Sequence, residues 1–299
     1  MANIEHFSLL QRGATIWNEW RQNNPNIEPD LRGANLRFAN LQGANLQKVN
    51  FREADLSFST LISADLSNAN LTNASFEKAE LIDTCLIKAE AIAANFASAN
   101  LQDAILNEVN LISASLKLAN LKNADLINAN LIATDLQQAY LRFADLSDAA
   151  LVRSNLSEAD LIEANLSNAN LTNANLYKTQ LIGVYLYRAK LEKASLREAR
   201  LHQAYLLGAS LRSTDLYKAD LRFANLSKVE LQNSNLTLAN LRGANLSKSD
   251  LTGADLTGSN LRGANLNKTN LSETKLVDAN FQETIGTEMR SFDCKSIKQ

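Results

Sequence analysis

The stretch from Ala34 to Lys48 reads ANLRFANLQGANLQK, which is three copies of one five-residue unit in a row. Every fifth residue from Leu31 to Phe281 is apolar, without an insertion or deletion. Of these 51 central residues, 46 are Leu, four are Phe and one is Ala91. The residue two places before the central one is small in all 50 cases, and the residue directly before it is Asn or Asp in 32 of 50. The consensus unit is therefore Ala-(Asn/Asp)-Leu-x-x.

A five-residue period fits neither an α-helix nor a flat strand. In a helix each residue turns by about 100°, so successive leucines would lie about 140° apart around the axis. In a strand an odd period would place successive leucines on opposite faces. Within one unit, however, Ala and Leu are two residues apart and point to the same side of an extended segment. The chain must turn once in every unit to keep that side inward, which winds it into a coil filled with Leu and Ala.

The other positions of the unit have the composition of turns. Asn, Asp, Gly, Ser and Lys are frequent there, and Asn and Asp hydrogen-bond nearby backbone and tolerate unusual φ. Both prolines, Pro25 and Pro29, precede the array, as expected where each backbone N–H pairs with the next coil.

The unit resembles the repeat of the pentapeptide-repeat family, in tracts such as 34–36, 64–66 and 244–246. The resemblance covers residues 30–284 and is specific to the fold. It implies an all-β fold: a rod-shaped, right-handed quadrilateral β-helix with four units per coil and short helical caps at its ends.

The segments outside the array are expected to cover its ends, because an open coil exposes unpaired backbone. Asn3 is suited to cap a helix whose first turn holds Glu5. We predict a helical cap and linker at residues 1–30, the β-helix at 31–284 and a C-terminal cap at 285–299. The alternatives are a docking helix at the N-terminus and dimerisation through the C-terminal end. Apolar residues recur at three- and four-residue spacing in the first segment, at Ile4, Phe7, Leu10, Ala14, Trp17 and Trp20.

Composition and motifs exclude several classes of function. The formal net charge of -2 is too balanced for a general nucleic-acid binder. There is no signal-peptide pattern and no long apolar run, and Cys85 and Cys294 form neither a disulfide framework nor a metal motif. His6 and His202 have no partner at ligand spacing, and no nucleotide-binding or nucleophile motif occurs. We expect a cytoplasmic, non-enzymatic protein without catalytic residues, metal or cofactor, and without direct nucleic-acid or membrane binding.

Outward residues 20 positions apart should stack in columns if one coil contains 20 residues. Five of the six tyrosines lie within 41 residues, and Tyr and Arg are typical anchors of protein interfaces. The alternative is neutral drift at tolerant outward positions. Two basic columns extend from this cluster, with Arg242 and Arg262 in one and Lys228, Lys248 and Lys268 in the other. The candidate interaction surface consists of Tyr185, Tyr187, Arg188, Arg200, His202, Tyr205 and Arg222.

A second column is formed by β-branched residues at the position directly after the central residue. A ladder of β-branched side chains stabilises stacked strands. The alternative is an exposed apolar stripe for a partner or a second copy. This secondary candidate consists of Ile92, Ile112, Ile132 and Val152.

Charge is segregated along the chain. Residues 50–165 hold 7 basic and 16 acidic residues, whereas residues 177–228 hold 10 basic and 4 acidic ones. Such polarity suits a partner of complementary charge, or head-to-tail association. A homodimer formed through the C-terminal end is the alternative.

Two functional hypotheses follow. The first is a protein-binding scaffold or regulator with an unidentified protein partner. The resemblance supports it, because cyanobacterial members include a regulator of cell differentiation that acts through protein contacts, and the N-terminal WNEWRQNNP segment resembles cyanobacterial relatives. The alternative is a DNA mimic that binds DNA gyrase or another DNA-binding protein, as the family's quinolone-resistance members imply. The acidic tract favours mimicry, and the basic tract opposes it.

Overall fold

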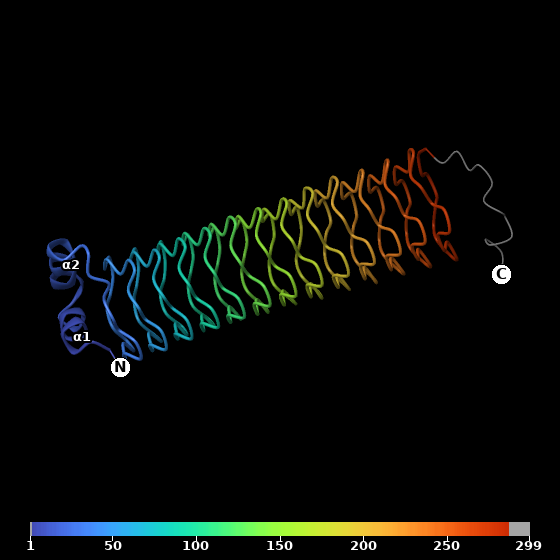
Figure 1. The fold of residues 1–299 in the computed structure, drawn as a ribbon. Helices are drawn as coiled ribbons and strands as arrows, with labels where there is room; N and C mark the ends of the chain where they lie inside the picture. The colour runs from blue at the N-terminus through green and yellow to red at the C-terminus, as the bar shows by residue number, and fades with distance from the viewer. Residues whose placement is uncertain (1, 287–299) are drawn as a thin grey trace. The chain divides into compact units, whose positions relative to one another are not determined.

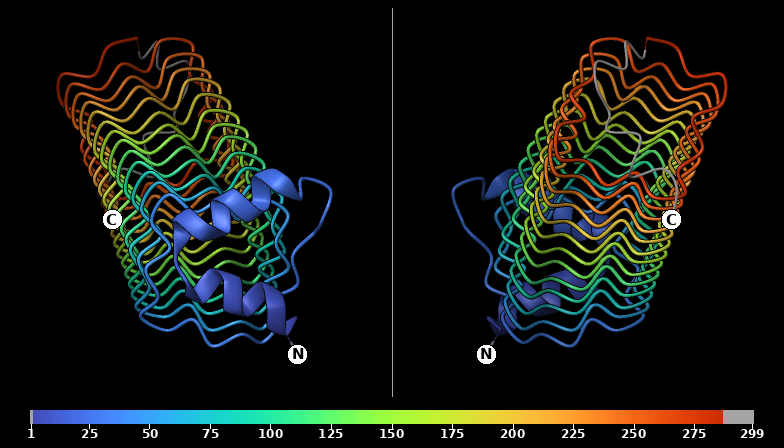
Figure 2. Two further views of the ribbon diagram at one scale, coloured as in Figure 1. Left: turned by 90° about the vertical axis from the view of Figure 1, so that its left-hand side faces the viewer. Right: turned by 90° about the vertical axis from the view of Figure 1, so that its right-hand side faces the viewer.

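The computed structural model describes residues 2–286, and the chain forms two compact units, Met1–Asn155 (unit 1) and Leu156–Gln299 (unit 2). In each unit the repeats wind into stacked coils of 20 residues (Figure 1). Viewed end-on, successive coils within each unit overlie one another (Figure 2). Residues pair in parallel with residues 20 positions along the chain, from Asp30↔Asn50 onward in unit 1 and from Asp160↔Gln180 onward in unit 2. Each coil therefore contains four repeats.

Each repeat makes a tight turn at the same place. The N–H of the small residue donates to the carbonyl of the central residue, as from Ala34 to Leu31 at 3.1 Å. The third turn residue has a φ between 53° and 70° in all 51 repeats, and 43 of these residues are not glycine. A positive φ at this position is the mark of a type II turn. Residues branched at Cβ strongly disfavour positive φ, and Val, Ile and Thr are absent from all 51 positions.

Backbone pairing takes the form of isolated bridges. Four residues of every repeat belong to a turn, so only the residue before the central Leu is left to bridge. The predicted all-β chain is confirmed only in part: residues 2–286 contain parallel β-bridges but no longer strand. Hydrogen bonds still join successive coils in both directions, from Leu36 N–H to Asp55 C=O at 2.7 Å and from Asp55 N–H to Ala34 C=O at 2.9 Å.

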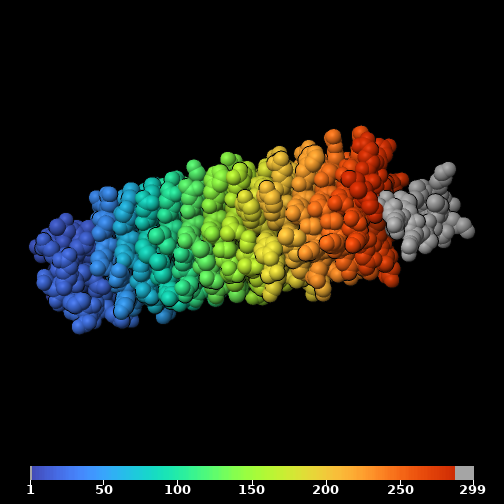
Figure 3. Space-filling view, turned by 90° about the horizontal axis from the view of Figure 1, so that it is seen from above, coloured from blue at the N-terminus to red at the C-terminus, as the bar shows by residue number. Residues whose placement is uncertain are grey.

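The interior is filled by the central and the small residues, which are buried almost throughout. Most Ser and Thr hydroxyls at the small position donate to backbone carbonyls, as from Thr134 Oγ1 to Leu111 O at 2.7 Å, whereas the Ser259 hydroxyl is buried without a hydrogen-bond partner among residues 2–286. The rings of Phe76 and Phe96 stack one coil apart, with centroids 4.8 Å from each other. Side chains pack closely over the outside of the coils in each unit, on the face shown in Figure 3.

Two helices precede the coils of unit 1, α1 (Ile4–Gln11) and α2 (Ala14–Asn23). Asn3 caps α1 by accepting the N–H groups of Glu5 and His6 at 2.9 and 3.3 Å. The helical pattern is interrupted at Gly13, whose φ of 102° favours glycine.

The helix α2 docks on the open edge of the first coil. The fully buried Trp17 donates from Nε1 to Asn45 O at 2.7 Å. Asn18 accepts the Asn45 N–H at 2.8 Å, and Arg21 donates to Gln47 O at 2.9 Å. These side chains bind backbone groups that a preceding coil would otherwise pair. Most of the predicted C-terminal cap, residues 287–299, lies outside the described residues.

Candidate interaction surface

The coil places three residues of every repeat on the outside: the second and third turn residues and the bridging residue. Because one coil contains 20 residues, each outward position continues in a column through the coils of a unit. The sequence-predicted surface residues all lie in unit 2, and the predicted β-branched column lies in unit 1.

Tyr185 and Tyr205 form the centre of the surface in unit 2. They are bridge partners in successive coils, and their rings stack with centroids 4.9 Å apart and an interplanar angle of 5°. The two side chains are nevertheless 47% and 48% exposed. They line an open depression of about 510 Å³ together with Ile182 and Phe223. The structure thus brings these two predicted residues together as one aromatic feature.

Tyr187 and Arg188 form a second pair on the next turn of the same coil. The guanidinium of Arg188 lies over the ring of Tyr187, 4.9 Å from its centroid. Both side chains are exposed. A cation over an aromatic ring is favourable, so the pair presents its ring and charge as one unit.

His202 and Arg222 gather around Asp220. Arg222 donates to Asp220 twice, from Nε at 2.8 Å and from Nη2 at 2.7 Å. Burial raises the pKa of Asp220, but the hydrogen bonds from Arg222 outweigh this and lower it, while the same pair raises the pKa of Arg222. His202 Nδ1 is 3.8 Å from the same carboxylate, beyond hydrogen-bond distance, and is buried without a hydrogen-bond partner among residues 2–286. Arg222 is therefore engaged within the molecule.

Arg200 lies apart from the tyrosine pair. It precedes the turn at 201–204, whereas Tyr205 follows this turn, so the two residues belong to different sides of the coil. Arg200 is exposed and bridges to Gln180 and Asp220.

The β-branched column of unit 1 is half-buried at all four residues. The N–H groups of Ile112 and Ile132 are held by the side chains of Asn110 and Asn130, each at 3.4 Å. Ladder packing of this kind uses much of the apolar surface within the unit.

Sequence reasoning missed the aromatic residues at the third turn position. Phe223 is 58% exposed beside the tyrosine pair. In unit 1, Phe38 and Phe58 stack with centroids 5.2 Å apart, and Arg37 lies 5.1 Å from the Phe58 centroid. The signal was available, because Phe38 and Phe58 are 20 residues apart and therefore share a column.

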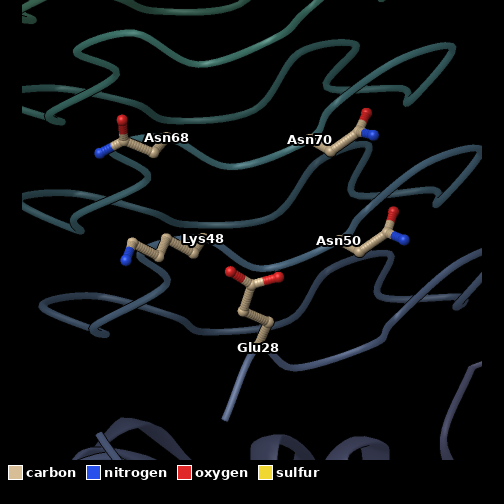
Figure 4. A pocket seen from close by; sticks show the side chains of 5 residues that line it. All are labelled: Glu28, Lys48, Asn50, Asn68 and Asn70. Atoms are coloured by element: carbon tan, nitrogen blue, oxygen red, sulfur yellow. The ribbon is translucent and has the colours of Figure 1, made fainter. Parts of the chain in front are cut away.

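A second depression, of about 340 Å³, lies in unit 1 and is lined by polar and charged residues. Figure 4 shows the Glu28 side chain extending between Lys48 and Asn50, with the amino group of Lys48 pointing away from it and Asn68 and Asn70 on the next coil. A single carboxylate with a lysine and amides does not make a metal site. Within residues 2–286, no group of three or more His, Cys, Asp or Glu side chains is placed to hold a metal ion. No helix in that range has the length and apolarity needed to cross a membrane.

Comparisons with known proteins agree with this architecture. The family model for pentapeptide repeats matches residues 30–90 and 94–285 in overlapping copies. No curated protein matches the chain.

Among solved structures, HetL from the cyanobacterium Nostoc sp. strain PCC 7120, a pentapeptide repeat protein involved in heterocyst differentiation regulation, is 31% identical. The match covers 77% of this chain and 90% of HetL, with a TM-score of 0.39. QnrB1, a plasmid-mediated fluoroquinolone resistance protein, is 10% identical over 77% of this chain and 92% of its own, with a TM-score of 0.36. Rfr23 from the cyanobacterium Cyanothece 51142 is 34% identical over 42% of this chain and 63% of its own, with a TM-score of 0.17. These superpositions are too distant to carry a functional argument, but the repeat matches and the identity to HetL show that the chain belongs to the pentapeptide-repeat family.

Proposed function

We propose that this chain is a non-enzymatic protein-binding scaffold or regulator, built as a right-handed quadrilateral β-helix, and that its recognition surface centres on Tyr185 and Tyr205. The observation that carries the proposal is a stacked tyrosine pair that remains half exposed at an open depression. Large aromatic side chains with a polar tip are typical anchors of protein interfaces. The exposed Phe223 and the Tyr187–Arg188 pair add further anchors of the same type.

The experiment is affinity capture from native lysate with mass spectrometry, comparing two variants. Replacing Tyr185, Tyr205 and Arg188 with Ala is expected to abolish capture of the main partner. The fold should survive, because outward substitutions away from special backbone features change stability little. The matched control replaces Ile112 and Ile132 with Thr, which keeps the β-branching and removes apolar surface. Loss of the partner in the control and its retention in the tyrosine variant would assign recognition to the β-branched column instead.

A DNA mimic that binds DNA gyrase or another DNA-binding protein is the second candidate. The acidic tract at residues 50–165 favours it. However, several of its aspartates accept the N–H of the residue two places on, as Asp55 does from Ser57 at 3.0 Å and Asp135 from Gln137 at 3.0 Å. Asn performs the same role elsewhere, so these carboxylates have a structural reason to be present. A gyrase supercoiling assay tests the alternative, and inhibition at micromolar protein would favour it over the scaffold.

A further inference from the structure

One group of basic residues in unit 2 lies on the side of the coils that carries the tyrosine pair. Five successive coils contribute equivalent segments to this side, and together the segments contain seven Arg or Lys residues and no Asp or Glu. The formal net charge of -2 for the whole chain conceals this concentration of positive charge. The segments are 182–188, 202–208, 222–228, 242–248 and 262–268.

Two of the four arginines in this group are already bound to carboxylates from outside the five segments. Arg222 holds Asp220 with two bonds of 2.7 and 2.8 Å. Arg262 holds Glu283 with two bonds of 2.7 and 3.2 Å. Two-point binding is the geometry in which a guanidinium best recognises a carboxylate. Carboxylates are therefore the ligands that this row of arginines already binds within the molecule.

Four other cations on the same side have no ion-pair partner in the described part of the chain: Arg242, Lys228, Lys248 and Lys268. The three lysines occupy equivalent positions in successive coils, a spacing of about 4.8 Å between backbones. Like charges so placed repel one another. The coils before and after these five place Glu163 and Glu283 in the equivalent segments, and the pKa of Glu283 is lowered by its hydrogen bonds from Arg262 and also by the charge of Arg242. No carboxylate lies within the five segments themselves, so an external anion would relieve the repulsion along the lysine row.

An exposed apolar ring lies beside the unpaired arginine. The ring of Phe223 covers Gly243, where an added Cβ would come within 2.6 Å of the ring. Gly243 directly follows Arg242 in the turn, so the ring and the guanidinium belong to adjacent coils of one surface. Aromatic and cationic groups together are characteristic of protein interfaces.

The stacking within the tyrosine pair favours a protein ligand over a single-stranded nucleic acid. Proteins that bind single strands stack bases on free aromatic faces. Tyr185 and Tyr205 instead stack on each other at 4.9 Å, so each ring has one face already covered.

We infer that Arg242 and the lysine row of Lys228, Lys248 and Lys268 bind the carboxylates of an acidic segment in a partner protein, with Phe223 as the apolar contact beside them. This inference rests on the proposed scaffold function and names the chemistry of its partner.

Fluorescence anisotropy with defined probes tests the inference. The probes are a labelled, end-blocked peptide of about eight residues alternating Glu and Thr, its Gln–Thr counterpart, and an oligothymidylate of about eight nucleotides. We expect the Glu peptide to bind, to bind less tightly when NaCl rises from about 50 to about 200 mM, and to outcompete both other probes. The double substitution R242Q/K248Q should weaken binding about 10-fold. The matched control K117Q/K122Q removes two exposed lysines from unit 1 and should change affinity less than about twofold.

Several results would overturn the inference. If the Glu peptide does not bind, or if the control variant loses as much affinity for it as R242Q/K248Q does, the assigned site is wrong. Tighter binding of the oligothymidylate makes the ligand a nucleic acid. Salt-sensitive self-association in sedimentation velocity, lost in R242Q/K248Q, makes the occupant a second copy. Neither Arg242 nor Lys248 is changed in the Tyr185, Tyr205 and Arg188 variant, so failure here is separable from failure of the scaffold proposal.

Discussion

Unit 1 and unit 2 share one interior and one turn, but their outer columns behave differently. In unit 1 the column containing Ile112 and Ile132 is half-buried, because short β-branched side chains at the second turn position pack along the stack. In unit 2, Tyr185 and Tyr205 stack just as regularly and still remain about half exposed. A regular column is therefore not a binding surface by itself. The length of the side chain and the position in the repeat decide how much of it a partner can reach.

The charges of the two units differ as well. Unit 1 contains 12 basic and 17 acidic residues, and unit 2 contains 18 basic and 15 acidic residues. The interior has no part in this difference, since its central positions are apolar in both units. Position in the repeat therefore decides what a residue contributes. Inward residues and turn residues determine the coil, whereas outward residues can differ between the units without changing it.

A charge buried in the interior should destabilise both units to the same extent. Leu131 and Leu231 occupy the same position of the coil and are fully buried. Replacing either with Lys buries an unpaired charge, and we expect each variant to lose more than about 5 kcal/mol of unfolding free energy or not to fold. Leu118→Lys is the control, because Leu118 is 42% exposed and should tolerate the change within about 0.5 kcal/mol. Urea unfolding followed by circular dichroism measures all three. A comparable loss at Leu118 would mean that burial is not the cause.

The interiors of the two units differ in the layer of Ala91 and Phe96, and two substitutions in unit 1 can remove this difference. Unit 1 has Ala91 followed by Phe96, where unit 2 has Leu191 followed by Leu196 in the equivalent coil positions. Ala91→Leu alone should overpack the layer at a cost of roughly 1–3 kcal/mol. Adding Phe96→Leu produces the unit 2 pattern and should recover much of the loss, less the lost stacking on Phe76. A double-mutant cycle without coupling would show that the two side chains do not share a layer.

The sequence was sufficient to predict the coil, because the same spacing of apolar and small residues recurs in every repeat. The spacing of Leu and Ala predicts the inward face, and four repeats per coil follow from the family resemblance. The sequence did not predict that the pairing among residues 2–286 is limited to single bridges, since the period does not reveal that four residues of each repeat belong to the turn. The helix break at Gly13 was also missed, because the apolar spacing continues across it.

The candidate surface could be predicted only as a set of columns. The register correctly paired Tyr185 with Tyr205, because residues 20 apart must be neighbours in successive coils. It could not show that Arg222 is held by Asp220, since that contact depends on the side-chain conformations at one corner. Nor could it show the exposure of Phe223, which follows from the positive φ of its turn position and the lack of a side chain at Gly243.

The shared turn predicts a further effect that should be equal in the two units. Ser113 and Ser213 are third turn residues with φ values of 57° and 56°. Replacing either with Val should cost about 1–2 kcal/mol, because a β-branched side chain is strained at positive φ. Ser147→Val and Ser247→Val place the same residue at the second turn position and should be nearly neutral. Thermal unfolding compares the four variants, and equal losses at both positions would contradict the role of φ.

The smallest expected effect is a dependence of stability on acid pH, again common to both units. Burial raises the pKa of Asp55, but hydrogen bonds from Ser57 and Arg37 outweigh this and lower it. Hydrogen bonds from Thr252, Gln232 and Asn270 likewise lower the pKa of Asp250.

A carboxyl group whose pKa is lower in the folded state stabilises the fold above its unfolded pKa of about 3.9. That contribution is lost as the pH falls through the folded pKa. Asp55→Asn and Asp250→Asn keep an oxygen that can accept the turn N–H, as Asn does in many other repeats, and remove the titration. Urea unfolding at neutral pH and below pH 4 should therefore show near-equal stability at neutral pH and a shallower acid loss in both variants. If only one variant lost its pH dependence, the common turn would not be its origin, and the neighbours particular to that unit, Arg37 beside Asp55 or Gln232 beside Asp250, would be responsible.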